Sequence, residues 1–375
     1  MDDLFTIEES MQHCVVNIKV IGVGGGGNNM VDHMAREGLR GIEIIAANTD
    51  AQHLATSLAA QKLQLGEKLT KGLGAGMKPQ VGKEAAEESY DEIREILKGA
   101  QIVFVATGLG GGTGTGASSV VARAAKENGS MTIAVCTMPF LMEGTKRTKL
   151  AKEGFELLKQ ECDSVVLIQN DKLLSVIDKN LGYAESLVMV DAVLARAVRG
   201  ISSIVLPSRM KGIKTDFADL STVMSHKGTA LMGMGYAKGA DSAYEALKEA
   251  VESPLVDNLS MKGSLGVLVN FQFHPAYPLT LVQRAMQQIR DDADEDADVF
   301  FGTSIDDKLE QDEAYVTIIA TGFERQAVNN TAVSFDEAQR QRPVIHTLSK
   351  AVGDYESLVD NKNLDVPAFI RRQVD

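Results

Sequence analysis

From Val15 onward, short runs of β-branched and other apolar residues alternate with stretches in which apolar residues recur every three or four positions. The runs predict strands, and the stretches between them predict helices. The strands are expected at 16–21, 42–47, 102–106, 131–135 and 164–168, and the helices at 30–38, 79–97, 113–128 and 143–162. Strands that alternate with helices of this length are typical of βαβ units around a parallel sheet buried on both faces. This part of the chain is therefore predicted to be a doubly wound α/β domain.

A longer helix is predicted over 184–205, where Leu187, Val190, Leu194 and Val198 follow one another at three- and four-residue spacing. At 1.5 Å per residue it would be roughly 30 Å long, which suits a connector between two domains. Beyond it the pattern changes, and it predicts helices at 242–251 and 279–290 and strands at 265–273, 298–304 and 314–322. The expected fold class is therefore α/β, with a doubly wound parallel-sheet domain joined by a long central helix to a smaller α+β domain.

This pattern divides the chain into six predicted parts. They are an N-terminal extension (1–14), the α/β domain (15–183), the central helix (184–206), the α+β domain (207–323), a flexible linker (324–363) and a terminal peptide (364–375). The linker is rich in Gln, Asn, Thr, Ser and Asp and has little periodicity. The terminal peptide regains apolar and charged residues, and its composition leaves open whether it docks on a partner or is a frayed end.

Composition and charge exclude several classes of protein. Of the 375 residues, 44% are hydrophobic and 24% charged, and no apolar run approaches the roughly 18 residues of a spanning helix. The acidic start of the chain is unlike a signal peptide, so we expect a cytoplasmic protein. The net charge is −13, and 291–313 alone holds eleven acidic residues and one basic residue, which argues against a nucleic-acid partner. We interpret that acidic stretch as a solvated face or loop.

Cysteine and histidine show no metal or disulfide pattern. The three cysteines, Cys14, Cys136 and Cys162, are far apart and form no C-x-x-C pair, which fits a reducing compartment. The six histidines show no H-x-x-x-H spacing. We therefore expect neither a zinc site nor a disulfide framework, and we interpret the histidines as core or surface residues.

Three glycine-rich segments carry the candidate chemistry. Segments 22–29 and 108–116 each lie between a predicted strand and a predicted helix, where backbone N–H groups at the helix N-terminus can face a phosphate. Two such cradles in one sheet indicate a nucleotide with several phosphates. Segment 72–79 precedes a helix and could close over a terminal phosphate. Gly22-x-Gly24-x-x-Gly27 alone would favour an NAD-dependent oxidoreductase, but that alternative leaves 108–116 without a role.

The segment from Gly110 to Gly116 resembles the signature loop of the tubulin superfamily, and further segments resemble its FtsZ family of bacterial cell-division GTPases. Those segments are 24–29, 48–50, 72–79, 139–140, 143–147, 170–174, 216–219 and 222–224. The resemblance runs from 15 to 323 and returns between Asp365 and Gln373, which is similar to the family's C-terminal peptide. It implies a GTP-binding, GTP-hydrolysing protein that polymerises head to tail into the filaments of the mid-cell division ring.

The resemblance also implies the residues of the site. GTP or GDP would be bound, with Mg²⁺ held through its phosphates. The phosphates would be held by Gly25, Gly26, Gly27, Asn28, Asn29, Gly112, Thr113 and Gly114, and the γ-phosphate would lie near Ala75 and Gly76. The resemblance also implies nucleotide binding by Asn48, Asp50, Gly108, Gly110, Gly111 and Thr115. Glu143 and Arg147 would contact the ribose and the phosphate edge, and Pro139 is a further residue implied to bind the nucleotide. Asn170 and Asp191 would read guanine, whose N–H donors and O6 acceptor suit an amide and a carboxylate.

Hydrolysis, by the same resemblance, needs two acidic residues from the next subunit. Asp216 and Asp219 match them and would orient the attacking water, so turnover would require assembly. Without the resemblance, Asp216 reads as a helix N-cap. Pro367, Phe369 and Ile370, beside two arginines, imply docking of the terminal peptide on membrane-tethering division proteins, so that membrane contact would be indirect.

Three positions depart from the family's pattern. Lys214 stands where Asn is usual, Leu187 where a Phe commonly stacks on guanine, and Gln169 where Pro is usual. A cation near the γ-phosphate could support the developing charge or displace water and metal. Lys214 therefore keeps a second interpretation open, a slowly hydrolysing structural or regulatory filament protein of the same superfamily.

Overall fold

The computed structural model describes residues 16–38, 41–173, 182–205, 217–226, 229–253, 264–292 and 297–323, all within one compact unit that spans Met1–Gln326. The predicted extension, linker and terminal peptide lie outside the described residues, as do Lys214 and Asp216. The predicted domain boundaries accordingly stay predictions. None of the described helices is long and apolar enough to cross a membrane.

The described helices and strands follow one another along the chain in a fixed order. They are β1 (Ile18–Val23), α1 (Gly24–Glu37), β2 (Ile42–Asn48), α2 (Ala51–Thr56), β3 (Gln61–Gln64), α3 (Glu67–Thr70), α4 (Pro79–Glu88), α5 (Tyr90–Leu97), β4 (Ile102–Gly108), α6 (Thr113–Glu127), β5 (Met131–Met138), the 3₁₀ helix η1 (Leu141–Glu143), α7 (Thr145–Glu161), β6 (Ser164–Gln169), α8 (Asn170–Leu173), α9 (Tyr183–Val205), α10 (Phe217–Met224), β7 (Thr229–Lys238), α11 (Ser242–Val251), β8 (Gly266–Phe273), α12 (Leu279–Asp292), β9 (Asp298–Ile305) and β10 (Glu313–Thr321).

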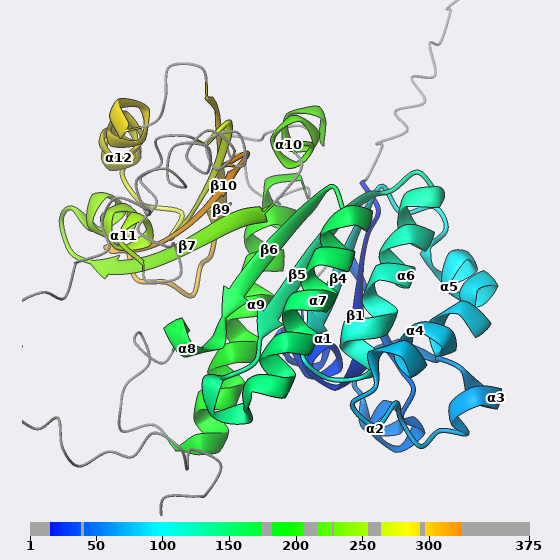
Figure 1. Cartoon of the computed structure of the whole chain (residues 1–375). Coiled ribbons are helices and arrows are strands. Elements are labelled where there is room, and N and C mark those ends of the chain that lie inside the picture. The colour runs from blue at the N-terminus through cyan, green and yellow to red at the C-terminus, as the bar shows by residue number, and fades with distance from the viewer. Residues whose placement is uncertain are drawn as a thin grey trace, which may run out of the picture. The chain divides into compact units, whose positions relative to one another are not determined.

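The strands form one sheet in the order β3-β2-β1-β4-β5-β6-β7-β10-β8-β9 (Figure 1). The first six are mutually parallel, which confirms the predicted doubly wound α/β sheet. In the second half, β10 runs antiparallel to both β7 and β8. The two halves meet where Val165 and Val166 of β6 pair in parallel with Thr229 and Ala230 of β7.

Helices cover both faces of the parallel part of the sheet. Ile18 and Val20 of β1 pack in one apolar cluster with α1 and α9, whereas Ile21 and Val23 pack in a second cluster with α4, α5, α6 and α7. This explains why the strands read as continuous apolar runs in the sequence. The chain order reverses between β1 and β4, so the loops after these two strands diverge and leave a crevice at their carboxyl ends, where α/β sheets bind ligands.

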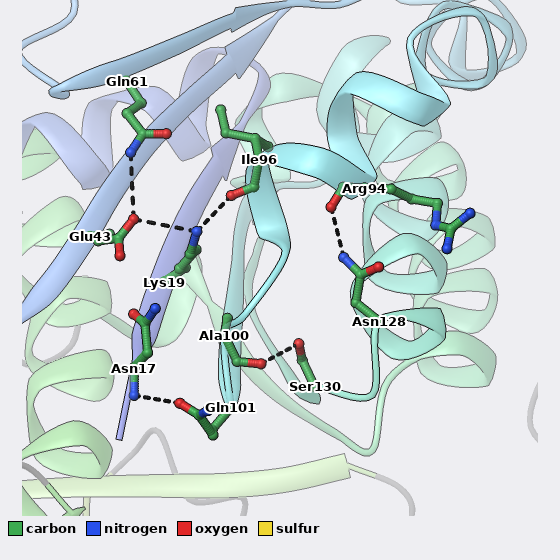
Figure 2. A network of polar contacts seen from close by, with 10 residues as sticks. All are labelled: Asn17, Lys19, Glu43, Gln61, Arg94, Ile96, Ala100, Gln101, Asn128 and Ser130. Atoms are coloured by element: carbon green, nitrogen blue, oxygen red, sulfur yellow. Dashed lines mark hydrogen bonds and ion pairs between the residues drawn. The ribbon is translucent and has the colours of Figure 1, made fainter. Parts of the chain in front are cut away.

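The amino ends of the same strands are held by internal polar contacts (Figure 2). Lys19 of β1 is 7% exposed, and its Nζ donates to the carbonyl oxygen of Ile96 at 2.9 Å and lies 3.4 Å from Glu43 Oε2. Nearby, Asn17 N donates to Gln101 Oε1 at 2.6 Å. These contacts join β1, β2 and α5, and we assign them a structural role.

Several local predictions differ from the structure, and the pattern predicts none of the short elements α2, β3 and α3. The helix expected over 79–97 is broken into α4 and α5 at Ser89, whose hydroxyl accepts from Gly66 N at 3.0 Å. The pattern does not predict strand β7; Gly235 in it packs against α11, where a Cβ would lie 2.0 Å from the oxygen of Ala246. Helix α1 begins at Gly24 rather than near 30, because the first glycine segment itself forms its first turn.

Candidate functional site

The first glycine turn joins β1 to α1 and is tightly packed beneath. A Cβ on Gly22 would lie 2.3 Å from the oxygen of Gly27, and one on Gly27 would lie 2.3 Å from the oxygen of Ala106 in β4. Gly25 and Gly26 are exposed on its outer side. No described side chain caps α1, and its first turn contains no acidic residue. The N–H groups of that turn are therefore suited to bind an anion.

The second glycine turn joins β4 to α6 and touches the first. A Cβ on Gly24 would lie 2.6 Å from Gly114 N, and one on Gly114 would lie 2.5 Å from the oxygen of Gly108. Thr115 Oγ1 accepts from Gly110 N at 2.9 Å, which fixes the turn. Two helix N-termini thus converge at the crevice between β1 and β4, a geometry that suits adjacent phosphates.

The third segment, 72–79, packs against the second turn. A Cβ on Gly112 would lie 2.8 Å from Ala75 Cβ. Ala75 is buried, while Gly76 is exposed with φ of 56°. The segment is anchored where Gly74 N donates to the oxygen of Thr49 at 3.1 Å. The three glycine segments therefore lie in contact with one another, as a shared phosphate site requires.

A cavity of about 490 Å³ opens beside the first turn, a size typical of small-molecule sites. Its lining comes from that turn, the loop after β5, α8 and α9. The lining residues are Gly26, Asn29, Thr137, Phe140, Met142, Glu143, Arg147, Asn170, Leu187, Val190, Asp191 and Leu194. The predicted site residues among them are Gly26, Asn29, Glu143, Arg147, Asn170 and Asp191, which come from four segments of the chain.

Two polar side chains in this cavity, those of Asn170 and Asp191, have fewer hydrogen-bond partners among the described residues than they can take. Asn170 is buried, and no described group donates a hydrogen bond to its Oδ1. Burial raises the pKa of Asp191 to about 7; Arg36 opposes that rise and Asp32 adds to it. A buried acceptor and a desolvated carboxyl are both stabilised by N–H donors from a ligand.

The loop after β5 is held by two carboxylates. Glu143 Oε1 accepts from Phe140 N at 2.9 Å, and its other oxygen pairs with Arg147. Asp171 accepts from Leu141 N at 3.2 and 3.0 Å through its two oxygens. Glu143 and Arg147 thus satisfy each other in this structure, and Pro139 packs against Gly110. The sequence predicts no role for Asp171 itself, because its motif points to the neighbouring Asn170.

Asn28, Asn48 and Asp50 lie beneath or beside the first turn rather than on its surface. Asn28 is 0% exposed and Asn48 is 2% exposed. Asp50 caps α2 by accepting from Gln52 N at 2.9 Å and from His53 N at 3.1 Å. The polar atoms of these three side chains already have hydrogen-bond partners within the protein. Their direct contact with a nucleotide stays a prediction.

Asp219 lies away from the other predicted site residues that the structure describes. It is in α10, which ends shortly before β7, and the first residue of β7 pairs with Val165 near the start of β6. Asp219 is therefore at the amino edge of the parallel strands, whereas the glycine turns and the cavity are at their carboxyl edge. Among the described residues no group of three or more His, Cys, Asp or Glu side chains could hold a metal ion.

Comparison with known proteins gives two family matches. The GTPase domain of the Tubulin/FtsZ family matches residues 17–178, and the C-terminal domain of the FtsZ family matches residues 228–324. Proteins named cell division protein FtsZ from two Helicobacter pylori strains are 45% and 44% identical over 360 residues, covering 96% of this chain and 92% of each relative.

Solved structures show the same likeness. An empty FtsZ dimer from M. jannaschii matches with a TM-score of 0.79 and 38% identity, covering 83% of this chain and 89% of that chain. CetZ2 from Haloferax volcanii, in a GTPγS-bound protofilament, matches with a TM-score of 0.69 and 20% identity, covering 86% of this chain and 99% of that chain. The second likeness shows the fold alone.

Proposed function

The chain belongs to the FtsZ family of the tubulin superfamily, and from this premise we propose that its active site is completed only where two copies meet head to tail. As a member of this family it is a GTP-hydrolysing cell-division protein that forms filaments. Its GTPase domain implies that it binds GTP and GDP. The residues that bind the nucleotide and hydrolyse it are the subject of the proposal.

The glycine turns and the cavity form the nucleotide half of the site. The phosphates lie on the N-termini of α1 and α6, with the segment around Ala75 and Gly76 at the terminal phosphate. The base enters the cavity, where Asn170 and Asp191 meet the N–H donors and the O6 acceptor of guanine. Mg²⁺ binds through the β- and γ-phosphate oxygens and neutralises charge as the terminal phosphate leaves.

The observation that carries the shared site is the position of Asp219. Helix α10 lies at the amino edge of the strands, and β4 alone has seven residues, roughly 23 Å of strand, between that edge and Gly108. Within one chain Asp219 cannot reach a nucleotide at the glycine turns. A second copy stacked head to tail brings its Asp216 and Asp219 over the first copy's terminal phosphate, where a carboxylate orients the attacking water.

Exposed apolar side chains surround the nucleotide half and support such stacking. Leu73 is 84% exposed, Leu141 72% and Met142 70%. Met77 and Val188 are also exposed large apolar residues of this edge. A neighbouring copy would remove this surface from water. A head-to-tail contact is heterologous and need not close, so it produces open filaments.

The cellular role follows from the family. We place the filaments at the division site in mid-cell, in the cytoplasm, with the peptide from Asp365 to Gln373 docked on membrane-tethering proteins. Membrane contact is then indirect, and no nucleic-acid partner is involved.

The proposal is tested by measuring GTP turnover per subunit against protein concentration in the presence of Mg²⁺. A shared site predicts almost no turnover below a threshold concentration and a linear rise above it. Turnover proportional to protein from zero concentration would contradict the shared site. Filaments and GTP binding without turnover would instead favour the slowly hydrolysing alternative that Lys214 keeps open.

The affinity for GTP is expected to fall at acidic pH because of Asp191. Its carboxyl has a pKa of about 7 in the free protein, and only the ionised form accepts two N–H groups from guanine. Each pH unit below 7 should therefore weaken GTP binding by about tenfold, while binding changes little above pH 8. Equilibrium dialysis between pH 5.5 and 8.5 measures this, with Asp191→Asn as the control.

The Asp191→Asn variant should bind GTP more weakly at pH 8, because an amide oxygen accepts less strongly than a carboxylate. Its affinity should also depend less on pH than that of the wild type, the remaining dependence coming from the phosphates of GTP. Identical pH profiles for the two proteins would show that Asp191 does not titrate on binding.

A further inference from the structure

We propose that His53 is a positioning residue of the phosphate site. Through Asn48, the His53 side chain holds the first glycine turn in place. The inference rests on the proposed function, which puts nucleotide phosphates on that turn. His53 is a half-buried residue of the short helix α2 and belongs to none of the glycine segments. It is one of the histidines to which the sequence pattern assigns no role.

The direction of the hydrogen bond between His53 and Asn48 follows from a third group. Asn48 Oδ1 accepts from Asp50 N at 3.2 Å, so the amide nitrogen of Asn48 faces the other way. That nitrogen lies 3.2 Å from His53 Nδ1. An amide nitrogen only donates, so Nδ1 accepts, and in the neutral imidazole the proton is on Nε2.

The second proton of the Asn48 amide reaches the turn through Asn28. With the Asn28 amide oriented so that its nitrogen faces carbonyl groups, its oxygen accepts from Asn48 Nδ2 at 3.1 Å. Its nitrogen then lies 2.9 Å from the oxygen of Gly22 and 3.2 Å from that of Gly24. His53, Asn48 and Asn28 therefore form one chain of hydrogen bonds that ends on the backbone of the first glycine turn.

The imidazole also lies close beside the turn. A Cβ on Gly25 would lie 3.6 Å from His53 Cε1 and 3.7 Å from Nδ1, which is ordinary van der Waals distance. The ring thus lies beside Gly25, while Asn28 lies beneath the same turn. Because Asn48 is 2% exposed, removing the imidazole leaves one of its N–H protons buried without an acceptor. The turn then loses part of its support, and phosphate binding weakens.

Three substitutions separate positioning from direct contact with the nucleotide. An asparagine at 53 places an oxygen near the position of Nδ1, whereas a glutamine reaches toward the position of Nε2. We expect His53→Ala and His53→Gln to weaken GTP and GDP binding by about fivefold to tenfold, the effect of losing one hydrogen bond. His53→Asn should stay within about twofold of the wild type, because it restores the acceptor for Asn48.

Binding is measured by equilibrium dialysis at pH 8 on the full chain, with circular dichroism to show that each variant is folded. His33→Ala is the matched control, since His33 pairs with Glu37 at 3.4 Å near the far end of α1; its affinity should equal that of the wild type. Wild-type affinity in His53→Gln together with weakened binding in His53→Asn would show a direct Nε2 contact and overturn the positioning role. Equal GTP affinities of His53→Ala, His53→Gln and His53→Asn would overturn it as well. A wild-type protein that binds no GTP would overturn the proposed function as well.

Discussion

Replacing Asp219 by alanine is expected to lower the GTP turnover number by about 10² to 10⁴-fold, the usual contribution of a group that activates the nucleophile. GTP affinity should stay within about twofold of the wild type, because α10 lies at the opposite edge of the parallel strands from the glycine turns. Steady-state hydrolysis above the threshold concentration gives the first quantity, and equilibrium dialysis gives the second. A loss of turnover without a loss of binding is the signature of a group that acts in the reaction and not in binding the nucleotide.

The matched control for this variant is Glu245→Ala. Glu245 lies in the first turn of α11 as Asp219 lies in the first turn of α10, so each change removes one carboxylate from a helix N-terminus. The control should hydrolyse GTP at the wild-type rate. Equal losses in the two variants would mean that the effect comes from the helix and not from the reaction.

Mixing two inactive variants tests whether the site is shared. Asp219→Ala keeps the nucleotide half, and a double variant with alanine at Asn170 and Asp191 keeps the carboxylates at the other edge. In a random equimolar filament, about a quarter of the contacts join an intact nucleotide half to an intact Asp219. The mixture should therefore recover up to about a quarter of the wild-type turnover. No recovery, in a mixture shown to assemble, would place the whole active site within one chain.

The sequence predicts the parallel sheet well because its strands are buried on both faces. Ile18, Val20, Ile21 and Val23 face two different helix layers, and this produces an apolar run that a surface loop would not have. Strand β7 is not predicted, because its sequence lacks such an apolar run. Its glycines give no β signal, and the need for Gly235 becomes visible only when α11 is packed against it.

The candidate site likewise contains residues that the sequence predicts and residues that it does not. Two of the glycine segments can be recognised in the sequence because they lie between a predicted strand and a predicted helix, and the structure brings all three segments together. Asp171 and His53 each act by hydrogen bonding to one group. For Asp171 that group is Leu141 N, in a distant segment of the chain, and for His53 it is the buried amide of Asn48. No spacing in the sequence marks such contacts. Their partners can be recognised only after the backbone has been placed.

Gly114→Ala, which adds a single methyl group, is expected to weaken nucleotide binding strongly. The new Cβ would lie 2.5 Å from the oxygen of Gly108 and 2.7 Å from Thr107 Oγ1, and neither the backbone nor a buried strand residue can move away freely. Because Gly24 packs against Gly114 N, a shift here displaces both glycine turns. We expect GTP affinity to fall by more than about 100-fold, since several phosphate contacts of roughly 1.5–3 kcal/mol each depend on these turns.

Gly111→Ala distinguishes close packing from a general effect of adding a methyl group to this loop. No described atom lies within 4 Å of a Cβ at Gly111, and its φ is outside the left-handed region. The melting temperature of Gly111→Ala should therefore equal that of the wild type. Gly114→Ala should melt several degrees lower, because overpacking costs about 1–3 kcal/mol of stability. Differential scanning calorimetry without nucleotide compares the three proteins. Wild-type melting and wild-type GTP binding in Gly114→Ala would mean that the contact between the two turns is not what requires glycine there.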